Sequence, residues 1–147
     1  MRTFFTSDSH FGHDNIIKHC GRPCRERPFR DSAEMDRALM DAWNSVVSPG
    51  DLVYHLGDFS LRSPETVDAF LKKKLNGIKH LIVGNHDRTH GVTGWASMRE
   101  MDKIEVVGQS VFSATTRCGN GQACGMARCI CTAMCMAAYS RCQAPWR

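Results

Sequence analysis

The sequence predicts an α/β fold, because short apolar runs alternate with helical patterns along its amino-terminal part. Residues 2–6, 51–56 and 80–83 are rich in β-branched, aromatic or aliphatic side chains, and each run is followed at once by glycine or polar residues, as is typical of buried strands. Residues 32–47 and 64–75 lie between these runs and have helical patterns. The order strand, helix, strand, helix, strand indicates a parallel sheet with crossover helices.

Two features support the predicted helices. In residues 32–47 the apolar side chains recur at helical spacing; they are Met35, Leu39, Met40, Trp43 and Val47. Residues 64–75 begin with a proline, which is favoured at the first position of a helix, and Ser63 before it is a suitable N-cap.

The predicted strands end in polar clusters at residues 7–10, 57–58 and 84–87. Because the carboxyl ends of parallel strands meet at one edge of a sheet, where α/β proteins bind their ligands, we expect these clusters to lie together. Farther along the chain, residues 104–107 and 110–112 flank a Gly-Gln pair and predict a hairpin that begins a second sheet.

The polar clusters contain candidate metal ligands. Asp8 and His10 are separated by one residue, so both side chains can reach one ion, and this pair suits Mn, Fe or Zn. The carboxylate of Asp58 has two oxygens and can bridge two ions. Asn85 supplies a neutral carbonyl oxygen, whereas His86 points elsewhere because neighbouring side chains diverge.

Together, the three clusters resemble the calcineurin-like metallophosphoesterases. The residues that carry the resemblance are Asp8-Ser9-His10, Gly57-Asp58 and Gly84-Asn85-His86-Asp87, in that order. The longer runs at residues 7–13 (Ser-Asp-Ser-His-Phe-Gly-His) and 54–59 (Tyr-His-Leu-Gly-Asp-Phe) resemble a small bacterial and phage branch of that family. Each motif alone is common in turns, but three in order at predicted strand ends are a specific signal. The resemblance covers residues 1 to about 112.

The resemblance implies a four-layer αββα sandwich, of which residues 1–112 would form the amino-terminal half, with a dinuclear metal centre between its two sheets. Asp8 and His10 would bind one metal, Asp58 would bridge to the second, and Asn85 would bind the second. Two divalent ions about 3.5 to 4 Å apart would polarise a phosphoester and activate a water molecule. The implied activity is hydrolysis of a phosphomonoester or phosphodiester, in which Asp58 and His86 would be the catalytic residues.

The remaining roles are expectations of the same kind. His86 would act as general acid or as a donor to the phosphoryl oxygens. His13 and Asp87 are further candidates for substrate binding, although an ordinary capping or surface role is the alternative for His13, and His55 is expected to pack within its strand. The sequence leaves the two divalent metals open among Mn, Fe, Zn, Ni and Mg, and it does not identify the substrate or the oligomeric state.

The chain's 147 residues and its hydrophobic content of 42% fit one globular domain. No run of about 18 apolar residues exists, and polar residues follow the first predicted strand at once, so we expect neither a membrane span nor a signal peptide. We therefore expect a cytoplasmic enzyme that acts on a phosphoester substrate, has no membrane partner, and meets nucleic acid only as a possible substrate.

Residues 113–147 differ in composition from the rest of the chain. They contain most of the cysteines, whereas all seven histidines and every acidic residue precede position 106. Residues 1–112 have no net charge, so the net charge of +4 comes from four arginines in the tail: Arg117, Arg128, Arg141 and Arg147. Four scattered arginines are poor evidence for a nucleic-acid-binding surface.

The family resemblance requires three further histidines, in His-Tyr-Pro-like and Gly-His-x-His turns, but no histidine follows His90. The genetic code allows both turns in the frame read one nucleotide earlier. There, residues 113–119 can encode Ser-His-Tyr-Pro-Met-Arg and residues 132–137 can encode Gly-His-Val-His-Gly, with the valine and the last glycine forced by the code. We therefore interpret residues 113–147 as an irregular, out-of-frame tail without a domain of its own, and expect catalysis by this chain to be impaired.

The alternative from another class is a non-catalytic metal- or nucleic-acid-binding protein that uses the cysteine-rich, basic tail. Successive tail cysteines are separated by five, four, one, three and six residues. This spacing lacks the Cys-x-x-Cys pair that is typical of zinc modules, so composition favours the out-of-frame interpretation.

Overall fold

A four-stranded parallel sheet organises the computed structural model of the chain, which describes residues 1–22, 28–106 and 109–114. Its strands lie in the order β1 (Thr3–Thr6), β2 (Leu52–His55), β3 (Ile78–Ile82) and β4 (Ser97–Arg99). The first three confirm the predicted strands, and β4 was not predicted. The α/β class is therefore confirmed, and the architecture is consistent with the amino-terminal half of the sandwich that the sequence predicts.

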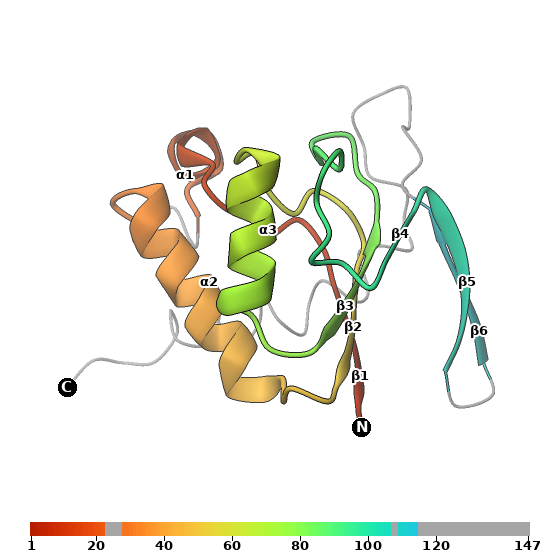
Figure 1. Ribbon diagram of the computed structural model, residues 1–147. Coiled ribbons are helices and arrows are strands. Elements are labelled where there is room, and N and C mark those ends of the chain that lie inside the picture. The colour runs from red at the N-terminus through yellow and green to blue at the C-terminus, as the bar shows by residue number, and fades with distance from the viewer. Residues whose placement is uncertain (23–27, 107–108, 115–147) are drawn as a thin grey trace.

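Three helices lie on one side of this sheet: α1 (Asp14–Cys20), α2 (Ser32–Val46) and α3 (Pro64–Lys73) (Figure 1). The second and third confirm the predicted helices, and Ser63 caps α3 by accepting a hydrogen bond from the Thr66 N–H. Asp31 caps α2 in the same way through the Glu34 N–H. Within the described part of the chain, every helix is too short or too polar to cross a membrane.

The predicted hairpin is also present. Strands β5 (Met101–Val106) and β6 (Gln109–Ala114) pair antiparallel in a second, two-stranded sheet. Figure 1 shows this hairpin on the side of the parallel sheet that faces away from the helices. The predicted irregular tail lies, from residue 115 on, outside the described residues.

The core fills the space between the helices and the sheet. Trp43 of α2, Leu71 of α3 and Val53 of β2 are among its most buried members. The Trp43 indole N–H donates to the Asn76 carbonyl at 3.0 Å, so this large side chain is buried without an unsatisfied donor. Burial of these apolar side chains is the main force that holds the helices on the sheet.

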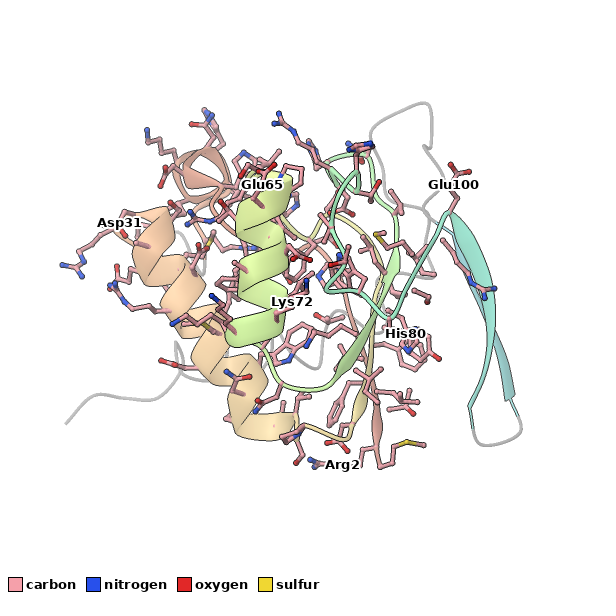
Figure 2. All side chains as sticks on the ribbon, in the orientation of Figure 1. Arg2, Asp31, Glu65, Lys72, His80 and Glu100 are labelled. Carbon is pink, nitrogen blue, oxygen red and sulfur yellow. The ribbon has the colours of Figure 1, made fainter. Side chains whose placement is uncertain are left out.

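Aromatic rings form a row across the opposite face of the sheet. Phe5, Tyr54 and His80 are register partners on β1, β2 and β3, and their ring centroids are 5.4 Å and 4.8 Å apart in succession. The His80 Nδ1 lies 2.8 Å from the Ser97 hydroxyl of β4, which continues the row to the edge strand. Figure 2 shows His80 on the side of the sheet where the β5–β6 hairpin lies.

The end of the sheet remote from the polar clusters is held by an ion pair between Arg2 and Asp51. The Asp51 carboxylate accepts hydrogen bonds from the Arg2 backbone N–H at 2.7 Å and from its guanidinium at 2.9 Å, and also from the Ser48 N–H. The Arg2 guanidinium reaches on to the Val46 carbonyl at the end of α2 (Figure 2). Backbone hydrogen bonds from Ser48 and Arg2, followed by the side-chain hydrogen bond and the charge of Arg2, lower the pKa of Asp51 from 3.8 to about 2.

We predict that Asp51→Asn lowers stability in a pH-dependent way. A carboxyl whose pKa is lowered by folding stabilises the native state fully above its unfolded pKa, and this contribution is lost as the pH falls from about 4 towards about 2. Urea unfolding at several pH values measures the effect: the midpoint of the variant should lie below that of the parent at pH 7, and the two should converge in acid. Asp41→Asn, which changes an exposed carboxyl on α2, is the control. A constant difference at all pH values would contradict the prediction.

Candidate metal centre

Backbone hydrogen bonds hold the ends of β1 and β2 side by side. The Asp8 N–H donates to the Gly57 carbonyl at 3.0 Å, and the His10 N–H donates to the Asp58 carbonyl at 3.0 Å. The parallel pairing of the strands thus continues into the polar loops that follow them. As a result, the side chains of Asp8, His10 and Asp58 gather at the carboxyl edge of the sheet, as predicted.

Asp87 attaches the third polar loop to the second. One of its carboxylate oxygens accepts hydrogen bonds from the Asp58 N–H at 2.9 Å and the Gly84 N–H at 2.8 Å, and the other accepts from the Phe59 N–H at 2.7 Å. Both oxygens therefore bind backbone, and the contacts of Asp87 are those of a residue that positions two loops. A role for it in substrate binding stays a prediction.

Ligand atoms from three side chains converge on one point. The atoms offered by Asp8, His10 and Asp58 lie within 4.8 Å of one another, which allows them to hold a metal ion together. The His10 Nε2 lies 3.8 Å from Asp8 Oδ1, and the buried His10 Nδ1 has no hydrogen-bond partner among the described residues. Two carboxylates and an imidazole form a donor set suited to Mn, Fe or Zn, so these residues fit the metal that the sequence predicts.

The backbone at these three residues is strained. Asp8, His10 and Asp58 have φ values of 54°, 50° and 57°, and in the described residues they are the non-glycine residues with positive φ. A non-glycine residue in this region costs roughly 1–3 kcal/mol and persists only where the surroundings enforce it. The coincidence of the strained residues with the converging side chains indicates a functional site.

The backbone of His86 lies beside the Asp58 carboxylate, and the side chains of Asn85 and His86 are exposed. The His86 N–H donates to Asp58 Oδ1 at 3.1 Å. A Cβ atom at Gly84 would collide with the same carboxylate and with the Asp58 nitrogen, so only glycine allows this close approach. Asn85 is therefore held between two residues that contact Asp58.

The structure brings His13 into the site as well. Its ring lies 5.5 Å from that of His10 and 6.4 Å from that of His86, and His10 and His86 are 5.6 Å apart, all measured between centroids. His13 occupies the N-cap position of α1, but its side chain makes no capping hydrogen bond. Burial lowers the pKa of His13, and the charges of His10, His86 and Arg22 lower it further, which favours the neutral form of its ring.

Asp8 is the acidic partner of this cluster. Its contact with His10 lowers the pKa of its carboxyl, and a hydrogen bond from the Ser7 hydroxyl at 2.5 Å lowers it further, whereas burial acts in the opposite direction. The carboxylate form is therefore favoured, which is the form that binds metal ions.

His55 lies beneath the loop and confirms the expectation that it packs within its strand. It is fully buried on β2, and its Nε2 lies 2.8 Å from the Ser9 hydroxyl. Burial lowers the pKa of His55 to about 3. The imidazole is therefore neutral, and its contact with Ser9 supports the loop between the candidate ligands Asp8 and His10.

Sequence reasoning missed two supports of the site. The Arg22 guanidinium donates to the carbonyls of Asp8 and Ser9, and the Asp36 carboxylate accepts from the Gly12 N–H at 2.9 Å. Asp36 also forms a 2.6 Å ion pair with Arg62. Arg22 and Asp36 bind the site through backbone atoms, which every residue possesses, so no residue pattern in the sequence predicts these contacts.

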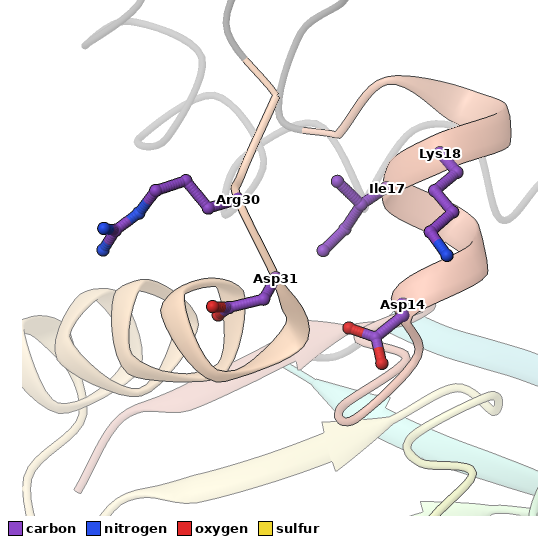
Figure 3. A pocket seen from close by; sticks show the side chains of 5 residues that line it. All are labelled: Asp14, Ile17, Lys18, Arg30 and Asp31. Atoms are coloured by element: carbon purple, nitrogen blue, oxygen red, sulfur yellow. The ribbon is translucent and has the colours of Figure 1, made fainter.

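A separate pocket of about 260 Å³ lies between α1 and the start of α2 (Figure 3). Its side chains are Asp14, Ile17, Lys18, Arg30 and Asp31. Both of its carboxylates are occupied by backbone groups, because Asp14 accepts from the Ser32 N–H and Asp31 from the Glu34 N–H. Helix capping thus accounts for its acidic residues.

The sequence profile of the calcineurin-like phosphoesterases matches residues 1–128. The chain belongs to this family of metal-dependent phosphoesterases. The family resemblance that the three motifs predict is therefore confirmed, and the match reaches beyond Phe112, where the sequence resemblance ends.

Relatives of the chain come from archaea, phages and bacteria. It is 42% identical over 88 residues to an uncharacterized protein of Methanocaldococcus jannaschii, covering 59% of this chain and 47% of that protein. It is 38% identical over 90 residues to the Gene 66 protein of Mycobacterium phage L5, covering 60% of this chain and 41% of that protein. The chain thus spans less than half the length of these curated relatives, and the phage match fits the predicted bacterial and phage branch.

A solved structure agrees with the fold. The crystal structure of a protein of unknown function from Aquifex aeolicus is similar with a TM-score of 0.61 and 28% sequence identity. The similarity covers 75% of this chain and 57% of that protein.

We predict that Gly84→Ala weakens metal binding more than tenfold. The added Cβ would displace the Asp58 carboxylate and would lie 3.0 Å from the Gly57 Cα, so the second and third loops could not both keep their places. Isothermal titration with Mn²⁺ measures the affinity. Gly50→Ala is the matched control, because a Cβ there would meet no atom within 4 Å. Equal affinity of the Gly84 variant and the parent would contradict the prediction.

Proposed function

We propose that this chain derives from a metal-dependent phosphoester hydrolase that uses two divalent ions at the carboxyl edge of the parallel sheet. The observation that supports the proposal most is the convergence of Asp8, His10 and Asp58, whose ligand atoms lie within 4.8 Å of one another. Each of these residues has strained backbone. Family membership makes phosphoesters the class of substrate.

In this proposal Asp8 and His10 hold the first ion, Asp58 is shared, and Asn85 contributes to the second. The ions, when bound, supply charge neutralisation and activation of water. The chain supplies position: the hydrogen bonds between the strand ends fix Asp8, His10 and Asp58 before any ion arrives. Mn, Fe, Zn, Ni and Mg all remain candidates for these ions.

His86 is assigned to the leaving group. Its side chain is exposed at the rim of the site, while its N–H is tied to the Asp58 carboxylate. This arrangement supports a role as general acid or as a donor to the phosphoryl oxygens. His13, whose ring lies next to those of His10 and His86, is proposed to contact the substrate from the side of α1.

We further propose that residues 113–147 are an out-of-frame tail and that the chain's catalysis is impaired as a result. The composition change after Phe112 supports this, because the tail lacks histidine and acidic residues. Asn85 and a shared Asp58 carboxylate alone are weak ligands for a second divalent ion.

The proposed function is tested in a chain whose reading frame has been restored, by comparing a variant of the metal ligand Asp58 with a variant of the proton donor His86. Asp58→Asn should abolish hydrolysis of an aryl phosphate ester and lower the metal content. His86→Ala should lower turnover about 10²- to 10⁴-fold, with metal content near that of the parent. Turnover kinetics with aryl esters of different leaving groups, together with metal analysis, give the measurements.

The loss caused by His86→Ala should shrink for an activated leaving group, which needs no proton. Unchanged turnover in Asp58→Asn would exclude the two-metal mechanism. Equal metal loss in both variants would show that His86 is a ligand.

The out-of-frame proposal predicts the nucleotide sequence of the gene. Read one nucleotide earlier, the codons for residues 132–137 should encode Gly-His-Val-His-Gly, and those for residues 113–119 should encode Ser-His-Tyr-Pro-Met-Arg. Sequencing across the junction checks this directly. The family match continues to residue 128, past the proposed junction, so the gene sequence is the decisive observation. Codons that exclude histidine at these places would end the proposal.

A further inference from the structure

The Arg22 side chain lies across the loop that carries the first two metal-ligand candidates. Its Nη1 donates to the Ser9 carbonyl at 2.7 Å and its Nη2 to the Asp8 carbonyl at 2.6 Å. These are the carbonyls of two successive residues, so the planar guanidinium bridges them as a fork. The loop between Asp8 and His10 is therefore held by Arg22 in addition to its hydrogen bonds with Gly57 and Asp58.

A tight turn after helix α1 brings Arg22 to this place. Helix α1 begins at Asp14, shortly after the ligand loop, and Gly21, with a φ of 63°, ends it in a left-handed cap. The Gly21 N–H donates to the Ile17 carbonyl at 2.9 Å, and the Arg22 carbonyl accepts from the Phe29 N–H at 2.8 Å. Hydrogen bonds thus hold the Gly21 N–H before the arginine and the carbonyl of the arginine itself, and these contacts place Arg22 beside the loop.

The loop needs such a support because its own conformation is unfavourable. Asp8 and His10 both have positive φ, and their N–H groups are used by the end of β2. The carbonyls of Asp8 and Ser9 accept their hydrogen bonds from Arg22, whose charged guanidinium provides two strong donors. The positive charge of Arg22 cannot itself help to hold a metal ion, because a guanidinium repels a nearby divalent cation.

We propose that Arg22 is a positioning residue that holds Asp8 and His10 in their metal-binding arrangement. This inference rests on the proposed function, since it takes these side chains to be metal ligands. It assigns Arg22 a role through backbone carbonyls and not through contact with metal or substrate. The positioning role and the charge of Arg22 predict opposite changes in metal affinity when the residue is replaced. Loss of the positive charge alone would strengthen metal binding, whereas loss of the support for the loop weakens it.

The test compares Arg22→Ala and Arg22→Lys in the full 147-residue chain. Both variants should bind Mn²⁺ about 10- to 100-fold more weakly in isothermal titration, the range typical for lost outer supports of metal sites. Lysine should fail to rescue because it keeps the charge but not the fork. Millimolar guanidinium should restore affinity in Arg22→Ala, and ammonium should not. Arg30→Ala, at an exposed arginine paired with Glu34, is the matched control and should bind as the parent does.

A second measurement works without metal. In hydrogen exchange of the metal-free protein, the amides of Asp8 and His10 should exchange faster in Arg22→Ala than in the parent, while amides in β3 should not change. Unchanged exchange together with equal or tighter Mn²⁺ binding would overturn the inference. A parent chain that binds no Mn²⁺ would instead refute the proposed function, and the exchange rates would still decide whether Arg22 positions the loop.

Discussion

Two backbone hydrogen bonds, from Asp8 N–H to the Gly57 carbonyl and from His10 N–H to the Asp58 carbonyl, are the constraint on which the candidate metal centre depends. They extend the pairing of β1 and β2 past the last strand residues and force two polar loops to run together. We call this pair of loops, joined by the two hydrogen bonds, the junction. Asp87 attaches the third loop to it, and Arg22 supports it from the side of α1.

The junction explains why strain and function coincide. The paired loops keep their ladder-like hydrogen bonds while Asp8, His10 and Asp58 adopt positive φ, so the unfavourable conformation is stabilised by contacts on both sides. Below the junction, the rings of Phe11 and Phe59 pack with their centroids 5.0 Å apart and are almost completely buried. Strained backbone above and close-packed core below give a site that is formed before its ligands bind.

The sequence was informative wherever residue type determined structure. Strands β1 to β3 followed from short apolar runs, and α2 and α3 followed from helical patterns. Asp8, His10 and Asp58 followed from their places after buried strands. Helix α1 has seven residues and one buried side chain, and β4 is a three-residue edge strand with mostly exposed side chains, so neither has a period to detect. Arg22 acts on backbone carbonyls, which leave no trace in the pattern of side chains.

The imidazole of His55 shows how the fold protects the charge balance of this site. It lies directly beneath the ligand loop, where a positively charged ring would repel any cation above it. Full burial lowers its pKa to about 3 and keeps it neutral, yet its Nε2 still provides a hydrogen-bond partner for the Ser9 hydroxyl. A buried apolar residue in its place would leave Ser9 without this partner, and a lysine would add charge. A neutral histidine therefore satisfies the loop without opposing the metal that the loop is built to hold.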